Sequence, residues 1–408
     1  MSRAKQRSSK RKRESESESD SLTVRNDICT DLISILDSIA KDTYELPLYR
    51  LHEPSGSLTG PDGVVHTLVE KPFAKGNFGQ VHAVEDDTKI VVKVIRIRDD
   101  KEKDQQIRRD NEAHAMRCTR NEMVIHSLLY CLTRKLSDYP DYPILPAIHF
   151  LGCAVEDDRP ETPSIVICGM ERMGNSGTFT EFITRGAVCD VLRVFGEICD
   201  VLQVLQKAFK FMHRDLHSNN IMLQSDANGH IHPVLIDFGY SSIQVTKCSC
   251  QPPVALSVER CRKCKCYSIG ALEKFVTDGG NMFGGHNAFN ASLDLAILLL
   301  NCEMPNEMRK NHNLKHKRPA NDHVTTALDH LIEELKSRFS KSMTKRVDKW
   351  KKERKKENVP HYAYALYDAE LVKDKKNQKI IDLGTSPAKV KPFFHGWSPA
   401  EIDVVINV

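Results

Sequence analysis

The chain has 408 residues, 40% of them hydrophobic, which is enough apolar material for two domains or one large two-lobed domain. No stretch approaches the roughly 18 uncharged apolar residues of a membrane span, and the first residues carry no apolar signal-peptide core. The net charge of +4 is too small for this length to indicate a nucleic-acid partner. We therefore expect a soluble, intracellular protein, with no membrane partner and with reduced cysteine thiols.

Residues 1–21 combine a basic run at 10–13 with alternating Glu and Ser that ends at Asp20. Such a tract cannot bury enough apolar surface to offset its loss of conformational entropy, so we predict that it is disordered. The basic run is either a nuclear-import signal or a solvated charge run, which leaves both nucleus and cytoplasm open. Residues 22–63 form a separate N-terminal extension in this interpretation.

Short β-branched runs separated by turn residues follow at 64–65, 76–84 and 90–97. They predict an antiparallel meander. A helix is expected over residues 103–135, and strand-like runs return at 148–155 and 164–170. Residues 64–172 therefore form a β-rich first lobe in our prediction.

The second half is predicted to be helical. Residues 188–211 carry apolar side chains at the i, i+3, i+4 spacing of a helix that faces a core. Two short strands, 220–223 and 233–236, flank a turn at 226–229. We predict an α+β fold in which residues 173–340 form a second lobe, with a cleft between the lobes, and residues 341–408 form a basic extension. Its basic run is either a solvated helix face or a phosphate or nucleic-acid patch.

Two polar segments carry the strongest chemical signal. HRDLHSNN spans residues 213–220, and LIDFG spans residues 235–239. Transfer of a phosphoryl group needs a positioned base, metal ligands and donors that face the phosphates. These two segments can supply the base and the metal ligands, because Asp215, Asn220 and Asp237 carry the carboxylate and amide oxygens that Mg²⁺ prefers and that a base requires.

A glycine-containing segment lies upstream of these motifs. Glycine permits the close approach of backbone to phosphate that a side chain would block. The segment comprises Ala74, Lys75, Gly76, Asn77, Phe78, Gly79, Gln80 and Val81. Lys93 follows in a β-branched run, and either Glu122 or Glu112 is its expected carboxylate partner. We prefer Glu122, because it begins the apolar stripe that turns this helix toward the core.

With these motifs in order from about residue 70 to 240, the chain resembles the eukaryotic-type protein-kinase superfamily. The resemblance implies a bilobal fold that binds ATP and Mg²⁺ in the cleft and phosphorylates a protein substrate, with the serine/threonine class expected over tyrosine. It implies that Asp215 is the catalytic base and that Asn220 and Asp237 hold Mg²⁺. Lys93 and Glu122 would position the phosphates.

The same resemblance extends to less specific sequence matches. Residues 164–174 are similar to the fifth strand and hinge of the family, which implies that Met170 is the gatekeeper and that the Met173 backbone contacts adenine. Met222 would form the floor of the adenine pocket. Asp294 resembles the buried aspartate that begins the central helix of the second lobe, where its role is structural.

Several positions depart from the family pattern. Ala74 replaces the first glycine, His217 replaces the lysine that follows the catalytic aspartate, and no A-P-E triplet follows the D-F-G. Such drift is similar to that of divergent kinases encoded by large DNA viruses. The departures leave open a pseudokinase that binds partners without catalysis, whereas the intact H-R-D and D-F-G argue against a small-molecule phosphotransferase.

A cysteine-rich stretch lies within residues 240–267, where kinases carry the activation segment. Short C-x-C and C-x-x-C spacings allow thiolates to converge on one Zn²⁺. The cysteines are Cys248, Cys250, Cys261, Cys264 and Cys266. Structural zinc and a loop with free or redox-active thiols are both compatible with this pattern.

Overall fold

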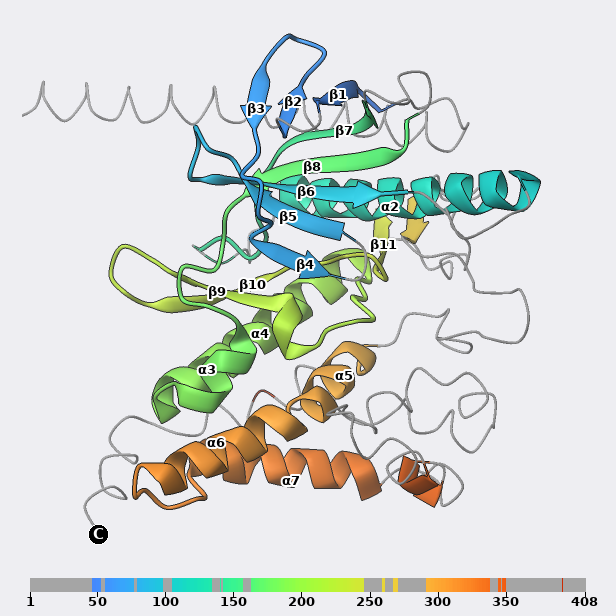
Figure 1. Ribbon diagram of the computed structural model, residues 1–408. Coiled ribbons are helices and arrows are strands. Elements are labelled where there is room, and N and C mark those ends of the chain that lie inside the picture. The colour runs from blue at the N-terminus through green and yellow to red at the C-terminus, as the bar shows by residue number, and fades with distance from the viewer. Residues whose placement is uncertain are drawn as a thin grey trace, which may run out of the picture.

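The computed structural model describes residues 46–349, with gaps at 53–55, 77–78, 98–104, 134–139, 141, 157–162, 246–258, 261–266, 271–290, 338–343, 346, together with residue 391. These residues form two lobes (Figure 1). The first lobe is built on a sheet and one long helix, and the second is mainly helical, as the sequence predicts.

Within the described chain, eight strands form the sheet of the first lobe, in the order β3-β2-β1-β7-β8-β6-β5-β4. β1 runs parallel to β7, and the other neighbours are antiparallel. The strands are β1 (Leu48–His52), β2 (Ser57–Thr59), β3 (Val65–Thr67), β4 (Ala74–Gly76), β5 (Gly79–Ala83), β6 (Ile90–Arg96), β7 (Ile148–Glu156) and β8 (Ile165–Glu171). The sheet is therefore mixed.

This sheet curls until the end of β3 returns to β5. Val69 N donates to Ala83 O at 2.9 Å, and Glu85 N donates to Thr67 O at 2.8 Å. The curl encloses a core of buried side chains, namely Tyr49, Leu51, Leu58, Leu68, Val84, Val92, Val94, Ala154, Ile165 and Ile167. Since β1 and β2 contribute to this core, part of segment 22–63 belongs to the sheet of the first lobe.

Helix α2 (Gln105–Thr133) packs against β7 and β8. Its second half carries buried apolar side chains at Ile125, Leu128 and Leu129, spaced along one face. This stripe orients the helix, and Glu122, one turn before it, is buried as well. The prediction of a helix over 103–135 agrees with α2.

The second lobe contains five described helices, which are α3 (Phe179–Arg185), α4 (Val188–Phe209), α5 (Leu293–Asn301), α6 (Glu303–Lys315) and α7 (His323–Ser337). The apolar positions of α4 repeat at helical spacing and are buried at the centre of the largest core cluster. α5 is buried on all sides from Leu293 to Leu300, and all of these residues except Asp294 are apolar, which is typical of a fully enclosed helix. The buried helices α4 and α5 therefore form the packed core of the second lobe.

The hairpin of β9 (Ile221–Ser225) and β10 (Ile231–Leu235) positions the two metal-ligand candidates. Asn220 ends the short helix η1 (Ser218–Asn220) just before β9, and Asp237 follows β10. Because Ile221 pairs with Leu235 in this antiparallel hairpin, its two outer ends meet. Ile236 N donates to Asn220 O at 3.0 Å, which fixes the meeting point.

After Gly239 the described chain forms a three-stranded sheet, in the order β11-β13-β12. The strands are β11 (Ser242–Val245), β12 (Glu259–Arg260) and β13 (Tyr267–Gly270). β13 contacts α2, so the segment that follows the D-F-G returns to the helix that carries Glu122.

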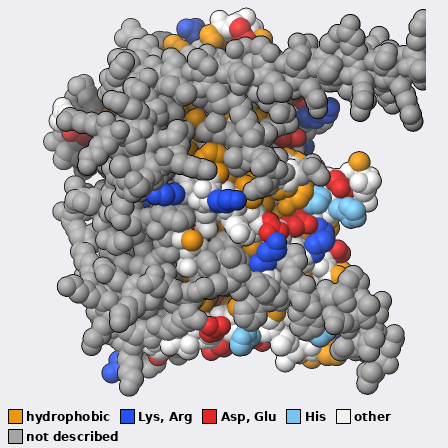
Figure 2. Space-filling view, turned by 180° about the vertical axis from the view of Figure 1, so that it is seen from behind, with side chains coloured by type: hydrophobic (Ala, Val, Ile, Leu, Met, Phe, Trp, Pro, Cys, Tyr) orange, Lys and Arg blue, Asp and Glu red, His pale blue; other side chains and the backbone are white. Residues whose placement is uncertain are grey.

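Figure 2 shows the opposite face, where acidic, basic and histidine side chains gather beside one another. The β9–β10 hairpin contacts α4 where His232 Nδ1 lies 3.1 Å from Glu197 Oε2, and Glu197 also forms an ion pair with Arg193. Asp226 lies 3.6 Å from both His230 and His232. Both signs of charge are therefore present in this network.

In the part of the chain that the structure describes, no helix is long and apolar enough to cross a membrane.

Candidate active site

The loop 213–220 is held from below by Asp294 in the first turn of α5. The carboxylate of Asp294 is fully buried and accepts the backbone N–H of His213 at 2.8 Å and of Arg214 at 2.7 Å. Arg214 has a φ of +65°, a left-handed conformation that is unfavourable for a residue with a side chain. Burial raises the pKa of Asp294 to about 6, so the group is ionised at neutral pH and holds this strained turn.

Lys93 of β6 lies between two carboxylates. Its Nζ donates to Glu122 Oε1 at 2.6 Å and lies 3.6 Å from Asp237 Oδ1. Burial by itself would lower the pKa of Lys93, but the charges of Glu122 and Asp237 raise it above its ordinary value. Burial raises the pKa of Glu122, and the charge of Lys93 opposes that effect. At 2.6 Å we regard Lys93 and Glu122 as an ion pair.

The alternative partner, Glu112, lies on the same helix and is partly exposed. It precedes Glu122 by ten residues, which corresponds to about 15 Å along the helix axis. The structure therefore brings Glu122 to Lys93 and leaves Glu112 further along α2.

Asp215 and Asn220 contact each other within the loop. Asn220 Nδ2 donates to Asp215 O at 2.9 Å and lies 3.4 Å from Asp215 Oδ2. This leaves the amide oxygen of Asn220 as the atom that can face a cation. The side chains of Asp215 and His217 are 24% and 33% exposed, and His217 Nε2 lies 3.8 Å from Asp215 Oδ2. Both side chains can therefore be reached by a substrate.

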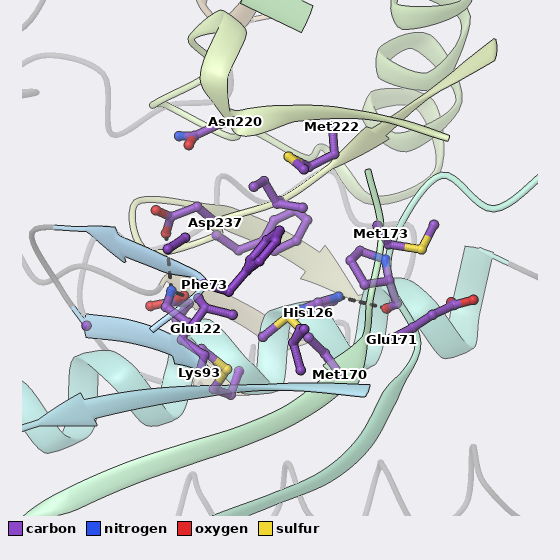
Figure 3. Close-up of a pocket in the computed structure, with 18 of the residues that line it drawn as sticks. Phe73, Lys93, Glu122, His126, Met170, Glu171, Met173, Asn220, Met222 and Asp237 are labelled. Atoms are coloured by element: carbon purple, nitrogen blue, oxygen red, sulfur yellow. Dashed lines mark hydrogen bonds and ion pairs between the residues drawn. The ribbon is translucent and has the colours of Figure 1, made fainter. Parts of the chain in front are cut away.

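A cavity of about 410 Å³ lies between the lobes. Figure 3 shows Lys93 and Met170 on the side of the first lobe, and Asn220 and Met222 on the side of the second. Its lining comprises Phe73, Ala74, Gly79, Val81, Val91, Lys93, Glu122, Met123, His126, Pro146, Met170, Glu171, Met173, Asn219, Asn220, Met222, Ile236, Asp237 and Phe238. Lys93, Glu122 and Asp237 lie together, whereas Met173 and Glu171 lie at the opposite end and the rest of the lining is mainly apolar (Figure 3). This arrangement suits a ligand with a flat apolar part and a charged part.

Three rings that pack at tilted angles lie next to Asp237, with Phe238 between His126 and His213. The ring centroids of His126 and Phe238 are 4.9 Å apart, and those of Phe238 and His213 are 5.5 Å apart. His126 Nε2 donates to Pro146 O at 2.9 Å. Burial lowers the pKa of His126 to about 4 and that of His213 to about 4, so both rings are neutral at pH 7. This packing keeps the Phe238 ring inside the protein.

Asp237 has a φ of +63°, a second left-handed residue with a side chain in the site. This turn directs its carboxylate toward Lys93. Burial alone would raise the pKa of Asp237, but the charge of Lys93 lowers it below its ordinary value. Asp237 is therefore ionised and available to a cation.

Most of the residues singled out in the sequence meet in this cavity, with some exceptions. Gln80 on β5 is not part of its lining, and neither is Asp215, whereas Lys75 and Gly76 are described on β4 by their backbone alone. Asn77 and Phe78 lie outside the described residues, and so do the cysteines of the predicted zinc site, Cys248, Cys250, Cys261, Cys264 and Cys266.

Sequence reasoning did not find several lining residues. Phe73 precedes the glycine-containing segment and could have been inferred from it. His126 follows Glu122 by one helical turn, so the i, i+4 spacing on α2 was the signal that places it beside the cleft. No sequence signal identified Pro146, which reaches the cavity from the loop before β7.

The donor set fits Mg²⁺. Among the described residues, no group of three or more His, Cys, Asp or Glu side chains is arranged to hold a metal ion. Mg²⁺ commonly uses only one or two protein ligands together with substrate phosphates and water. The free amide oxygen of Asn220 and the ionised Asp237 provide such a pair at the meeting point of the β9–β10 hairpin.

A search of curated proteins found no match to this chain. Residues 62–254, however, match the sequence model of a family described as "Haspin like kinase domain". That span includes β4–β6, α2, both polar motifs and the hairpin between them. Residues 62–254 of this chain are therefore a haspin-like kinase domain, a member of the eukaryotic-type protein-kinase superfamily.

Proposed function

We propose that the protein is an active kinase that transfers the γ-phosphoryl group of ATP to a hydroxyl of a protein substrate, of the serine/threonine class. The observation that carries this proposal is the contact of Lys93 with Glu122 at 2.6 Å and with Asp237 at 3.6 Å. A lysine held in this way can donate to phosphate oxygens while Asp237 remains available to Mg²⁺.

Each of the other residues of the site then has a role in this reaction. Asp215 accepts the proton of the attacking hydroxyl, because its carboxylate is reachable and lies beside Asn220. Asn220 and Asp237 would hold Mg²⁺, which would supply positive charge to offset that of the phosphates. Ala74, Gly79 and Val81 cover the nucleotide from the first lobe, and Met222 lies opposite them.

His217 occupies the place of the lysine found in many serine/threonine kinases. Its imidazole is one-third exposed and 3.8 Å from Asp215. An imidazole offers at most two N–H donors, whereas the ammonium group of lysine offers three, so we infer a weaker contact to the γ-phosphate than lysine would give. This substitution and Ala74 are the features that favour the pseudokinase alternative.

Transfer of label from γ-labelled ATP tests the proposal. Purified wild-type protein with Mg²⁺ should label itself or a generic protein substrate, and phosphoamino-acid analysis should find phosphoserine or phosphothreonine. The variant Asp215→Asn should bind ATP with unchanged affinity and lose label transfer by at least about a hundredfold, since it removes the base. ATP binding without transfer by the wild type would establish the pseudokinase instead.

A further inference from the structure

Six basic side chains gather where the C-terminal ends of α3 and α6 meet. Arg185 is the last residue of α3, Lys315 is the last residue of α6, and the two helix ends lie side by side (Figure 1). Arg309 holds them together, because its Nη1 donates to Ile183 O at 2.8 Å and to Gly186 O at 2.9 Å. We call this surface the α3–α6 patch, and it comprises Arg185, His312, Lys315, His316, Lys317 and Arg318.

The turn that follows α6 fixes the backbone of the patch. Lys317 N donates to Leu314 O at 3.0 Å, and Arg318 N donates to Asn313 O at 2.9 Å. Lys317 has a φ of +55°, a left-handed conformation that is unfavourable for a residue with a side chain. These backbone contacts hold the basic residues in one place before a ligand binds, which lowers the entropic cost of binding.

The basic groups of the patch lie close enough to repel one another. The ring centroids of His312 and His316 are 4.4 Å apart. Burial lowers the pKa of His312 below its ordinary value, and the charges of His316, Arg185 and Arg318 lower it further. Because neighbouring like charges raise the free energy of the folded protein, an anion that binds among them lowers it.

Other cations on these helices have acidic partners. Lys310 Nζ lies 2.6 Å from Glu307 Oε1 and 2.9 Å from Asp329 Oδ2. Asp322, a few residues beyond the patch, is already engaged by Arg309, whose Nε lies 2.7 Å from Asp322 Oδ2. The lysines and arginines of the α3–α6 patch, in contrast, form no ion pair with any residue that the structure describes. The patch therefore carries positive charge that an acidic ligand can compensate.

A segment of complementary charge is present in the same chain. Residues 14–20, which lie outside the described residues, have the sequence ESESESD and contain Glu14, Glu16, Glu18 and Asp20. These four acidic side chains match the four lysine and arginine side chains of the patch. A chain extended from Asp20 to residue 46 can span about 85 Å. A compact domain of about 300 residues has a radius of gyration of about 19 Å, so this acidic tract can reach the patch.

We propose that the acidic tract 14–20 binds the α3–α6 patch of the same chain. The described chain enters the first lobe at β1, whereas the patch belongs to the second lobe. Bound in this way, the N-terminal segment connects both lobes and excludes other anions from the patch. Phosphorylation of Ser15, Ser17 or Ser19 would strengthen the contact, because each phosphate adds nearly two negative charges. The inference goes beyond the proposed function and does not require an active kinase.

Carbodiimide cross-linking of the full chain tests the contact directly. This reagent joins an amine to a carboxylate only where the two groups touch, so mass spectrometry should find the tract linked to Lys315 or Lys317. A mixture of unlabelled and isotope-labelled chains should give links within one label only. Links between the two labels would show that the tract binds a second copy, and links to Lys12 alone would show that it binds the neighbouring basic run. Either result, or the lack of any link to the patch, would overturn the inference.

A peptide with the sequence of residues 14–20 measures whether the patch is already occupied. The tract-neutral variant carries Glu14→Gln, Glu16→Gln, Glu18→Gln and Asp20→Asn in the full chain. Fluorescence anisotropy should show that the peptide binds this variant at least about fivefold more tightly than it binds the wild type, because a tethered tract has a high effective concentration. Equal affinity for both proteins would mean that the tract does not cover the patch.

Two pairs of lysine substitutions, made in the tract-neutral variant, locate the binding surface. Lys315→Gln with Lys317→Gln should weaken peptide binding about tenfold, the loss expected when two exposed ion pairs are removed. Lys71→Gln with Lys89→Gln removes two exposed lysines of the first lobe and should leave the affinity unchanged. An equal loss in both pairs would mean that the peptide responds only to the net charge of the protein, and would refute the assignment. All four positions are exposed, so thermal unfolding should change little.

Two further ligands identify the kind of anion. The peptide with phosphoserine at Ser15, Ser17 and Ser19 should bind more tightly than the unmodified peptide, because of the added charge. A short DNA duplex tests the competing partner. If it binds the wild type and the tract-neutral variant equally and loses binding when Lys315 and Lys317 are replaced, the patch is free for nucleic acid and the inference is wrong. None of these measurements uses ATP, so an absence of label transfer would refute the proposed function alone.

Discussion

Lys93 and its carboxylates are the residues on which the chemistry depends most directly. A buried charge that loses its partner destabilises the fold by about 3–5 kcal/mol, because it is left without compensation. Asp237 remains 3.6 Å from Lys93 when Glu122 is replaced, so part of that compensation is kept. We therefore expect replacement of Glu122 to lower the unfolding free energy by an amount near the lower end of that range.

Glu122→Gln should lower the unfolding free energy by about 3 kcal/mol and reduce phosphoryl transfer at least tenfold. Urea denaturation and the label-transfer assay measure the two effects. Glu112→Gln is the matched control on the same helix, and it should change stability by less than about 0.5 kcal/mol, as partly exposed positions generally do. An equal loss in both variants would show that Lys93 does not depend on Glu122.

His126 makes stability depend on pH. Its pKa is lowered from 6.5 to about 4 by burial, so between these values the unfolded chain binds more protons than the folded protein. The unfolding free energy should therefore rise with pH across this window, and His126 contributes about 3 kcal/mol to that rise at most. Asp294, whose pKa is raised to about 6, contributes the opposite slope below pH 6.

His126→Leu isolates this contribution, because Asp294 is present in both proteins. Urea midpoints measured from pH 4.5 to 7 should give a shallower rise for the variant than for the wild type. Parallel curves would mean that His126 has the same pKa in the folded and unfolded states.

At the scale of elements, the closure of the first-lobe sheet by β1–β3 is the distinctive feature. Leu58 of β2 is fully buried in the enclosed core, although it precedes the span that matches the family. Loss of a strand that only extends the edge of a sheet lowers the unfolding free energy little. Loss of a strand whose side chains fill the core lowers it strongly. We therefore propose that β1 and β2 are integral parts of the first lobe.

Leu58→Ala should lower the unfolding free energy by about 2–4 kcal/mol through lost burial and the cavity that remains. Val64→Ala is the control in the same region, because Val64 is 48% exposed and should cost less than about 0.5 kcal/mol. Chemical denaturation of the full chain measures the unfolding free energy of both variants. A small effect at Leu58 would mean that β1 and β2 are dispensable.

For the whole molecule, ligand binding in the cleft should couple to the stability of both lobes. At a concentration of Mg·ATP about 100 times its Kd, the unfolding free energy should rise by about 2.7 kcal/mol. Asp237→Asn should lose most of this gain at the same concentration, and EDTA should reduce it in the wild type, because Asp237 is a proposed ligand of Mg²⁺. Thermal unfolding with and without nucleotide measures both. If Mg·ATP stabilises Asp237→Asn as much as it stabilises the wild type, Asp237 is not a ligand of Mg²⁺.

The sequence by itself determined the class of fold and the main chemical groups. Local periodicity was sufficient for α2 and α4, and the fixed spacings of HRDLHSNN and LIDFG were sufficient to single out Asp215, Asn220 and Asp237. These signals are local, because a helix face or a short motif is contained within a few consecutive residues. Whether the residues act as proposed remains a prediction.

Tertiary structure decided what depends on contacts between distant segments. The choice between Glu122 and Glu112 required the register of α2 against β6, and the contact of His126 with Phe238 joins residues more than a hundred positions apart. The incorporation of β1 and β2 into the lobe depended on parallel pairing with β7, which no local pattern specifies. The contact of Phe73 with Arg172 likewise arises only when the curled sheet brings the start of β4 to the end of β8, because packing rather than spacing places the two side chains together.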